Sequence, residues 1–156
     1  MDRSFIILLI ASTVLLASLG GVAWYKNQMN VPVEITAQAE IDESCDINLQ
    51  ACSLSISNVG QVTFSITPTP IPLVSDLSLL VKTNLKGIKQ VMVDFKGMDM
   101  EMGPNQIILK KNANGDFFGK GMLPVCIRYS MHWKASIYVE TSDGLYVAPY
   151  VFETHK

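Results

Sequence analysis

The N-terminal part of the chain contains one long uncharged segment, and this segment limits the possible folds more than any other sequence feature. It runs from Ser4 to Tyr25, between Arg3 and Lys26, and most of its side chains are aliphatic. A helix of this length covers roughly 33 Å, which is enough to cross a hydrocarbon core of about 30 Å. The remaining sequence has no second segment of this kind. We therefore predict one N-terminal transmembrane helix within residues 1–26.

The same segment also fits a cleaved signal peptide. In that interpretation Phe5–Ala17 is the apolar region, and Gly21-Val22-Ala23 is a cleavage site made of small residues. The apolar run is longer than the ~7–15 residues usual in signal peptides, and little positive charge precedes it, which favours the membrane helix. Under both interpretations we expect the long C-terminal part to be translocated across the membrane.

Three cysteines lie beyond this segment, at Cys45, Cys52 and Cys126. The spacing of the first two lacks the two-residue gap of a zinc knuckle or a thioredoxin motif. Asp46 and Asn48 can turn the chain between them, so we expect a Cys45–Cys52 disulfide in an oxidising compartment. Cys126 is then left over, and it is either buried and inert or kept as a metal ligand or redox group.

The soluble part divides by composition into a tether and a folded domain. Residues 27–52 are predicted to form a tether followed by an acidic, cysteine-containing segment. Within them, Glu34–Asp46 carries five acidic residues and no basic one. Residues 53–156 are predicted to form the folded domain.

Short apolar segments separated by turn residues are typical of strands, and they fill residues 53–156. Asn114-Gly115 predicts a hairpin with a type I′ turn, and Ser142-Asp143-Gly144 predicts a second hairpin. The proline-rich run Thr67–Pro72 should be an edge or crossover piece, because proline cannot donate a ladder hydrogen bond. The tether leads into an extended segment, residues 31–36, and the expected strands cover residues 53–57, 61–66, 77–83, 89–95, 106–111, 116–122, 133–140 and 145–152.

These seven or eight short strands after the tether, with no amphipathic helix beyond residue 26, predict an all-β domain. The fold that we expect is an immunoglobulin-like antiparallel β-sandwich, with an eight-stranded barrel as the alternative. Trp133 should be its buried indole.

Composition and motifs exclude two classes of function. The chain has 14 acidic and 12 basic residues, so it lacks the basic field that a nucleic-acid-binding protein needs. It has no glycine-rich phosphate loop, no nucleophile elbow and no histidine pair at metal-hydrolase spacing. We therefore expect neither nucleic-acid binding nor enzymatic activity.

Five of the eight methionines lie between residues 98 and 131. In an extended chain Met98, Met100 and Met102 project from one face, and they are either core residues of one strand or soft ligands for Cu(I). The core is the commoner role for such a methionine stripe, because alternation alone predicts it equally well, but the neighbouring glycines and Pro104 suggest a strand end at the solvent and so support the copper site. His132 alone would be an ordinary interface or core histidine, and His155 receives no role. The candidate copper ligands are Met98, Met100, Met102, Met122, Cys126, Met131 and His132.

The stretch from Ile71 to Thr154 resembles the YtkA-like and FixH-like extracytoplasmic domains. The resemblance rests on the following segments: Pro70–Pro72, Met98–Gly103, Asn114–Phe117 and Met131–Lys134. It implies an immunoglobulin-like sandwich that is secreted or anchored in the bacterial inner membrane, with the C-terminal domain in the periplasm. Some members of these families are linked to copper handling and to the assembly of haem-copper oxidases.

Two functions therefore follow from the sequence. The first is a membrane-anchored extracytoplasmic protein that binds or hands on Cu(I), or assists the assembly of a respiratory oxidase. The second is a metal-free interaction module that docks on a membrane protein complex through its span and a sandwich edge.

Overall fold

The computed structural model describes residues 20–21, 34–124 and 129–155. The chain forms two compact units, residues 1–33 and 34–156. In the first unit only Gly20 and Gly21 are described, and both are helical. No helix in the described part of the chain is long and apolar enough to span a membrane. The predicted membrane segment otherwise lies outside the described residues, so it stays a prediction.

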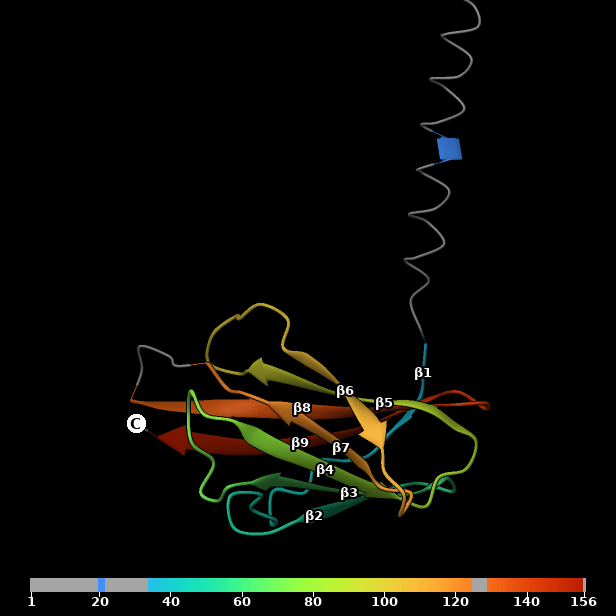
Figure 1. The fold of residues 1–156 in the computed structure, drawn as a ribbon, viewed down its shortest axis with the longest axis horizontal. Coiled ribbons are helices and arrows are strands. Elements are labelled where there is room, and N and C mark those ends of the chain that lie inside the picture. Colours follow the sequence, from blue (N-terminus) through green and yellow to red (C-terminus); the bar gives the residue numbers. More distant parts are fainter. Residues whose placement is uncertain (1–19, 22–33, 125–128, 156) are drawn as a thin grey trace, which may run out of the picture. The chain divides into compact units, whose positions relative to one another are not determined.

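The second unit is all-β, as predicted, and its described residues form nine strands (Figure 1). Most of the predicted strands are found within one to three residues of their expected ends. The strands are β1 (Ile35–Gln38), β2 (Cys52–Ile56), β3 (Gly60–Thr67), β4 (Leu77–Thr83), β5 (Ile88–Gly97), β6 (Gln106–Lys111), β7 (Phe117–Gly121), β8 (Ser130–Thr141) and β9 (Leu145–His155).

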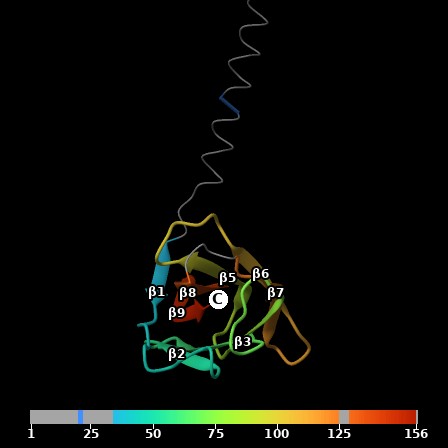
Figure 2. The ribbon, with the colours of Figure 1, turned by 90° about the vertical axis from the view of Figure 1, so that its left-hand side faces the viewer.

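The strands lie in the order β1-β9-β8-β5-β6-β7-β4-β3-β2. Strand β6 belongs to two layers, because its first part pairs with β5 and its last two residues, Lys110 and Lys111, pair with β7. The nine strands therefore make one sheet that curls into a nearly closed, sandwich-like barrel, as the view along the strands shows (Figure 2). The structure combines features of the predicted sandwich and of its barrel alternative.

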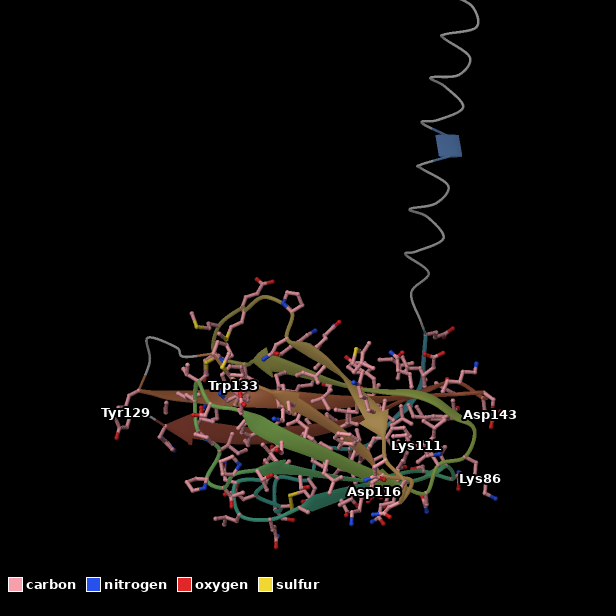
Figure 3. The ribbon with its side chains drawn as sticks, in the orientation of Figure 1. Lys86, Lys111, Asp116, Tyr129, Trp133 and Asp143 are labelled. Atoms are coloured by element: carbon pink, nitrogen blue, oxygen red, sulfur yellow. A yellow bond between two sulfur atoms is a disulfide. The ribbon has the colours of Figure 1, made fainter. Side chains whose placement is uncertain are left out.

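Alternating side chains build the core between the layers. In β4, Leu77, Leu79 and Val81 are buried, while the residues between them face outward. Trp133 on β8 (Figure 3) is buried, as expected, and its indole N–H donates a 2.9 Å hydrogen bond to Thr154 Oγ1 on β9. Buried polar groups need a hydrogen-bond partner, and the indole N–H of Trp133 therefore has one.

The sheet is mixed, and this corrects the prediction of a purely antiparallel sandwich. Strand β1 runs parallel to β9, and Ala39 N donates to Val147 O at 2.9 Å. The folded unit also begins at Glu34 and not at residue 53, because Ala39 and Ile47 are buried in the core. Without β1, strand β9 would present unpaired backbone N–H and C=O groups at the edge of the sheet, and β1 pairs with these groups. Part of the predicted tether is therefore a strand of the domain.

The hairpin between β6 and β7 is present, but its turn is not the predicted type I′ turn. Gly115 has a φ of 90°, whereas Asn114 does not have a positive φ. Gly115 N donates to Asn112 O, and Asn112 Oδ1 accepts from Asn114 N and Asp116 N at 2.9 and 3.0 Å. The Asn112 side chain thus favours a longer loop with only one left-handed residue, which glycine supplies.

The proline-rich run forms the connection between the paired strands β3 and β4, and only Thr67 belongs to a strand. Ile71 is buried, and its N–H donates to Asn48 Oδ1 at 3.4 Å. Further along this connection, Val74 N donates to Leu123 O at 2.9 Å. The run therefore closes one end of the barrel and lies against the cysteine-containing segment.

Candidate functional site

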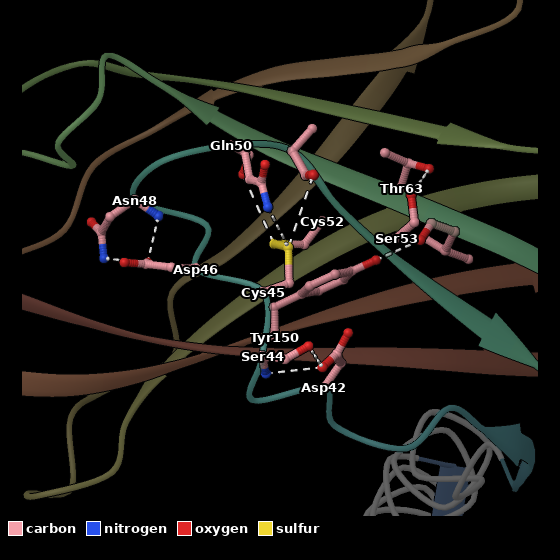
Figure 4. The surroundings of a disulfide bond; sticks show 12 residues. Asp42, Ser44, Cys45, Asp46, Asn48, Gln50, Cys52, Ser53, Thr63 and Tyr150 are labelled. Carbon is pink, nitrogen blue, oxygen red and sulfur yellow. Dashed lines mark hydrogen bonds between the residues drawn. A yellow bond between two sulfur atoms is a disulfide. The ribbon is translucent and has the colours of Figure 1, made fainter.

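The predicted disulfide between Cys45 and Cys52 is confirmed, with an S–S distance of 2.06 Å (Figure 4). We call residues 45–52 the disulfide loop. Asp46 Oδ1 accepts the backbone N–H of Asn48 at 2.9 Å, so these two residues turn the chain as expected. The Asn48 amide also donates to Glu153 O on β9 at 3.0 Å. The disulfide loop is therefore closed covalently and fixed to the last strand.

Residues 98–105, which we call the methionine loop, do not continue strand β5. The strand ends at Gly97, and the chain leaves the sheet until β6 begins at Gln106. Met98 and Met100 are 58% and 38% exposed, whereas Met102 is half-buried. The three thioethers therefore do not share one face of a strand, and the first two are not core residues. The glycine next to them does mark a strand end at the solvent, as the sequence indicated.

Met131 and Met102 fill the end of the core. Met131 is 2% exposed, and its Cε atom lies so close to Gly97 that a Cβ at this glycine would overlap with it. The same Cβ would lie 3.3 Å from Met102 Sδ. Both side chains thus pack against the surface of Gly97, where a larger residue has no room. Their arrangement is that of gap-filling methionines.

His132 lies on the outward face of β8 and is tied to the methionine loop. Its backbone N–H donates to Asp99 Oδ2 at 2.8 Å, and its Nδ1 lies 3.1 Å from the same oxygen. Met98 N also donates to His132 O at 2.9 Å. A carboxylate on Nδ1 favours the tautomer with the proton on that nitrogen, which leaves Nε2 with its lone pair for a metal ion.

Met98 and His132 line the same open cavity, which has a volume of about 900 Å³. His155 on β9 lines it too, together with Glu153, whose Oε2 lies 3.7 Å from His155 Nε2. In the β8–β9 register His132 is opposite Glu153, and His155 is opposite Ser130. The two histidines are therefore diagonal neighbours on one face, a relation that brings long side chains within reach of each other.

The other predicted copper ligands lie apart from this cavity or are not described. Met100 is exposed within the methionine loop. Met122 is 49% exposed beyond β7, and its carbonyl accepts a 3.0 Å hydrogen bond from Asn105 Nδ2. Cys126 lies outside the described residues. Among the described side chains, no three of His, Cys, Asp and Glu are placed to hold a metal ion.

Sequence reasoning missed His155, although one signal could have found it. The turn at Ser142-Asp143-Gly144 joins β8 to β9, and Glu140 pairs with Leu145. Counting outward from that turn along both strands places His155 two residues beyond the partner of His132. The register of this hairpin thus carries information that the position of His155 near the chain end conceals.

Comparisons of the chain with models of protein families, with curated proteins and with solved structures find no match.

Proposed function

We propose that this protein is a membrane-anchored extracytoplasmic protein that binds Cu(I) through Met98, His132 and His155. The observation that carries the proposal is the shared cavity, in which one exposed thioether and two imidazoles from three segments line the same space. Thioether and imidazole ligands are a set that suits Cu(I), and their exposure allows the ion to be passed on. Met100 is the nearest further donor along the loop.

Asp99 supports this site without binding the ion. Its Oδ2 contacts both the backbone N–H and the Nδ1 of His132, so it fixes the ring and the loop together. Ligating histidines commonly have such a carboxylate on their second nitrogen, and its loss costs about 10- to 100-fold in metal affinity. Met102 and Met131 support the site only by packing below Gly97.

The disulfide supports an oxidising location, which fits the periplasmic side of a bacterial inner membrane. The uncharged N-terminal segment would be the single-pass anchor. The two layers of strands support an immunoglobulin-like sandwich, in which β1, β9, β8, β5 and β6 form one sheet. In this setting the domain hands Cu(I) to a membrane complex or assists the assembly of a respiratory oxidase, as the family resemblance implies.

The test is an anaerobic Cu(I) titration of the full-length protein in detergent against a competing chelator. We expect Met98→Leu and His132→Gln each to weaken binding by about tenfold or more, and Asp99→Asn by about tenfold. His155→Gln should have an effect similar to that of His132→Gln. Met122→Leu is the matched control, because this methionine is similarly exposed (49% against 58% for Met98) but does not line the cavity.

Unchanged affinity in the Met98 and His132 variants would contradict the proposed copper site. The metal-free interaction module would then be the remaining function. One observation favours it: β2 is the last strand in the order and pairs only with β3 among the described strands, so it presents a sheet edge. Such edges add a strand from a partner.

A further inference from the structure

A second cavity, of about 310 Å³, lies between β5 and the methionine loop. Asp94 and Lys96 of β5 line it on one side, and Glu101 of the methionine loop and Gln106 of β6 line it as well. It shares no lining residue with the cavity that contains His132. Its polar side chains therefore have no part in the proposed copper site.

Asp94 is the unusual residue of this cavity. It alternates with the core residues Val93 and Phe95, so its side chain faces the outside of the sheet, yet it is only 2% exposed. Its Oδ1 has no hydrogen-bond partner among the residues that the structure describes. A buried carboxylate oxygen without a partner is strongly unfavourable, and in native proteins it usually marks a bound water or ion.

Lys96 does not neutralise this carboxylate effectively. Its Nζ lies 3.7 Å from Asp94 Oδ2, and its side chain is 68% exposed. Ion pairs with an exposed partner contribute little, because water and dissolved ions screen them. With Glu101 in the same lining, the cavity has two carboxylates against one weakly held ammonium group.

We propose that this cavity binds a divalent cation that prefers oxygen ligands, with Ca²⁺ as the best fit. Asp94 Oδ1 is the central ligand, and the Glu101 carboxylate and the Gln106 amide oxygen complete the protein part. Gln106 is directly opposite Asp94 in the β5–β6 register, which places the two side chains next to each other. Ca²⁺ accepts irregular shells of six to eight oxygens at about 2.3–2.6 Å, with backbone carbonyls and water filling the remaining positions.

Charge balance favours a divalent ion. The carboxylates of Asp94 and Glu101 together balance the two positive charges of the ion once the Lys96 ammonium group moves into the solvent. The exposure of the Lys96 side chain permits this movement. The ligands come from the end of β5, the middle of the methionine loop and the start of β6. Bound Ca²⁺ therefore links the loop to both of its flanking strands and makes its opening less frequent.

The first test is a calorimetric titration of the full-length protein in detergent with CaCl2. We expect Asp94→Asn to weaken binding at least tenfold and Glu101→Gln to weaken it several-fold. Lys96→Gln should tighten binding, because it removes the competing cation. Glu140→Gln is the matched control, since this exposed carboxylate of β8 lies outside the cavity.

The second test measures the loop directly. A glutamate-specific protease should cleave after Glu101 more slowly in CaCl2 than in a chelator, and this protection should disappear in Asp94→Asn. No heat of binding and no protection in the parent protein would overturn the proposal, as would equal affinity in Asp94→Asn. If Asp94→Asn fails to fold, Lys96→Gln decides: unchanged or weaker binding in that variant contradicts the site.

Discussion

The disulfide loop and the methionine loop both contain sulfur and both adjoin the end of the β8–β9 hairpin, but they are built differently. The disulfide loop is closed by Cys45–Cys52, and the Asn48 side chain bonds it to β9 and to the proline-rich run. The methionine loop has no covalent closure. Asp99 and Asn105 hold it to β8 and to the end of β7 by hydrogen bonds, and two of its three thioethers reach the solvent.

This difference separates two uses of sulfur in one domain. In the disulfide loop, sulfur restricts the chain and leaves no free ligand. In the methionine loop, the backbone is fixed at a few points while Met98 and Met100 stay exposed. A loop that has to accept and release an ion needs this second arrangement, because ligands that are packed into a core are neither accessible nor easily moved.

The largest expected effect concerns the methionine that lies beneath the methionine loop. Met131→Ala should lower the free energy of unfolding by about 2–5 kcal/mol, because it removes a buried side chain and leaves a cavity below Gly97. Denaturant unfolding followed by near-UV circular dichroism measures this. A loss below about 1 kcal/mol would mean that Met131 is less firmly packed than its burial indicates.

Removal of the disulfide should have the next largest effect. We expect Cys45→Ala combined with Cys52→Ala to cost about 2–3 kcal/mol, since the closed loop restricts the unfolded chain. The same unfolding experiment applies, with the reduced parent protein as a second comparison. A near-zero change would show that the hydrogen bonds of Asn48 alone hold the disulfide loop in place.

Tyr150, which lies close to the disulfide (Figure 4), should give a smaller, pH-dependent effect. Its hydroxyl donates to Val62 O at 2.6 Å, and burial raises the pKa of Tyr150 far above its ordinary value of 10.0. Only the unfolded state ionises near pH 10, so the contribution of Tyr150 to stability is complete below that pH and is lost as the pH rises above it. Tyr150→Phe should cost about 1 kcal/mol at pH 7.

The pH dependence itself is the sharper measurement. The parent protein should lose stability more steeply than Tyr150→Phe between pH 10 and 11, as measured by urea unfolding at fixed ionic strength. Parallel curves for the two proteins would contradict the raised pKa.

The smallest expected effect is that of the exposed methionines. Met98→Leu combined with Met100→Leu should change stability by less than about 0.5 kcal/mol, because both side chains are partly exposed outside the core and leucine keeps most of their apolar surface. Their role would then appear only in Cu(I) affinity. A large loss of stability would mean that these side chains pack, and the contrast between the two loops would disappear.

Much of the fold could be predicted because strand pairs leave local signals. Alternation predicted Leu77–Thr83 and Gln106–Lys111 at their observed ends. The parallel β1–β9 pair left no such signal, because its partners are about 110 residues apart and β1 is only four residues long. The Asn112 side chain also decided the β6–β7 turn against the Asn-Gly preference.

The sequence could predict the kind of ligands in the candidate site but not which residues form it. The sequence pointed to soft ligands around residues 98–132, and Met98 and His132 do line one cavity. It also counted Met131 among the candidates to complete the site, although the alternation of β8 places this side chain in the core. His155 and Asp94 were not among the predicted site residues, because the role of each depends on which strand or loop lies beside it.

The amino-acid sequence determined the all-β class, the disulfide and the supply of sulfur ligands, since each of these follows from residues close together in the chain. Tertiary structure decided which methionines are buried, where the two cavities lie and which histidines share one of them. These properties depend on how strands and loops pack in three dimensions, where the register of β8 against β9 and the path of the methionine loop set the contacts.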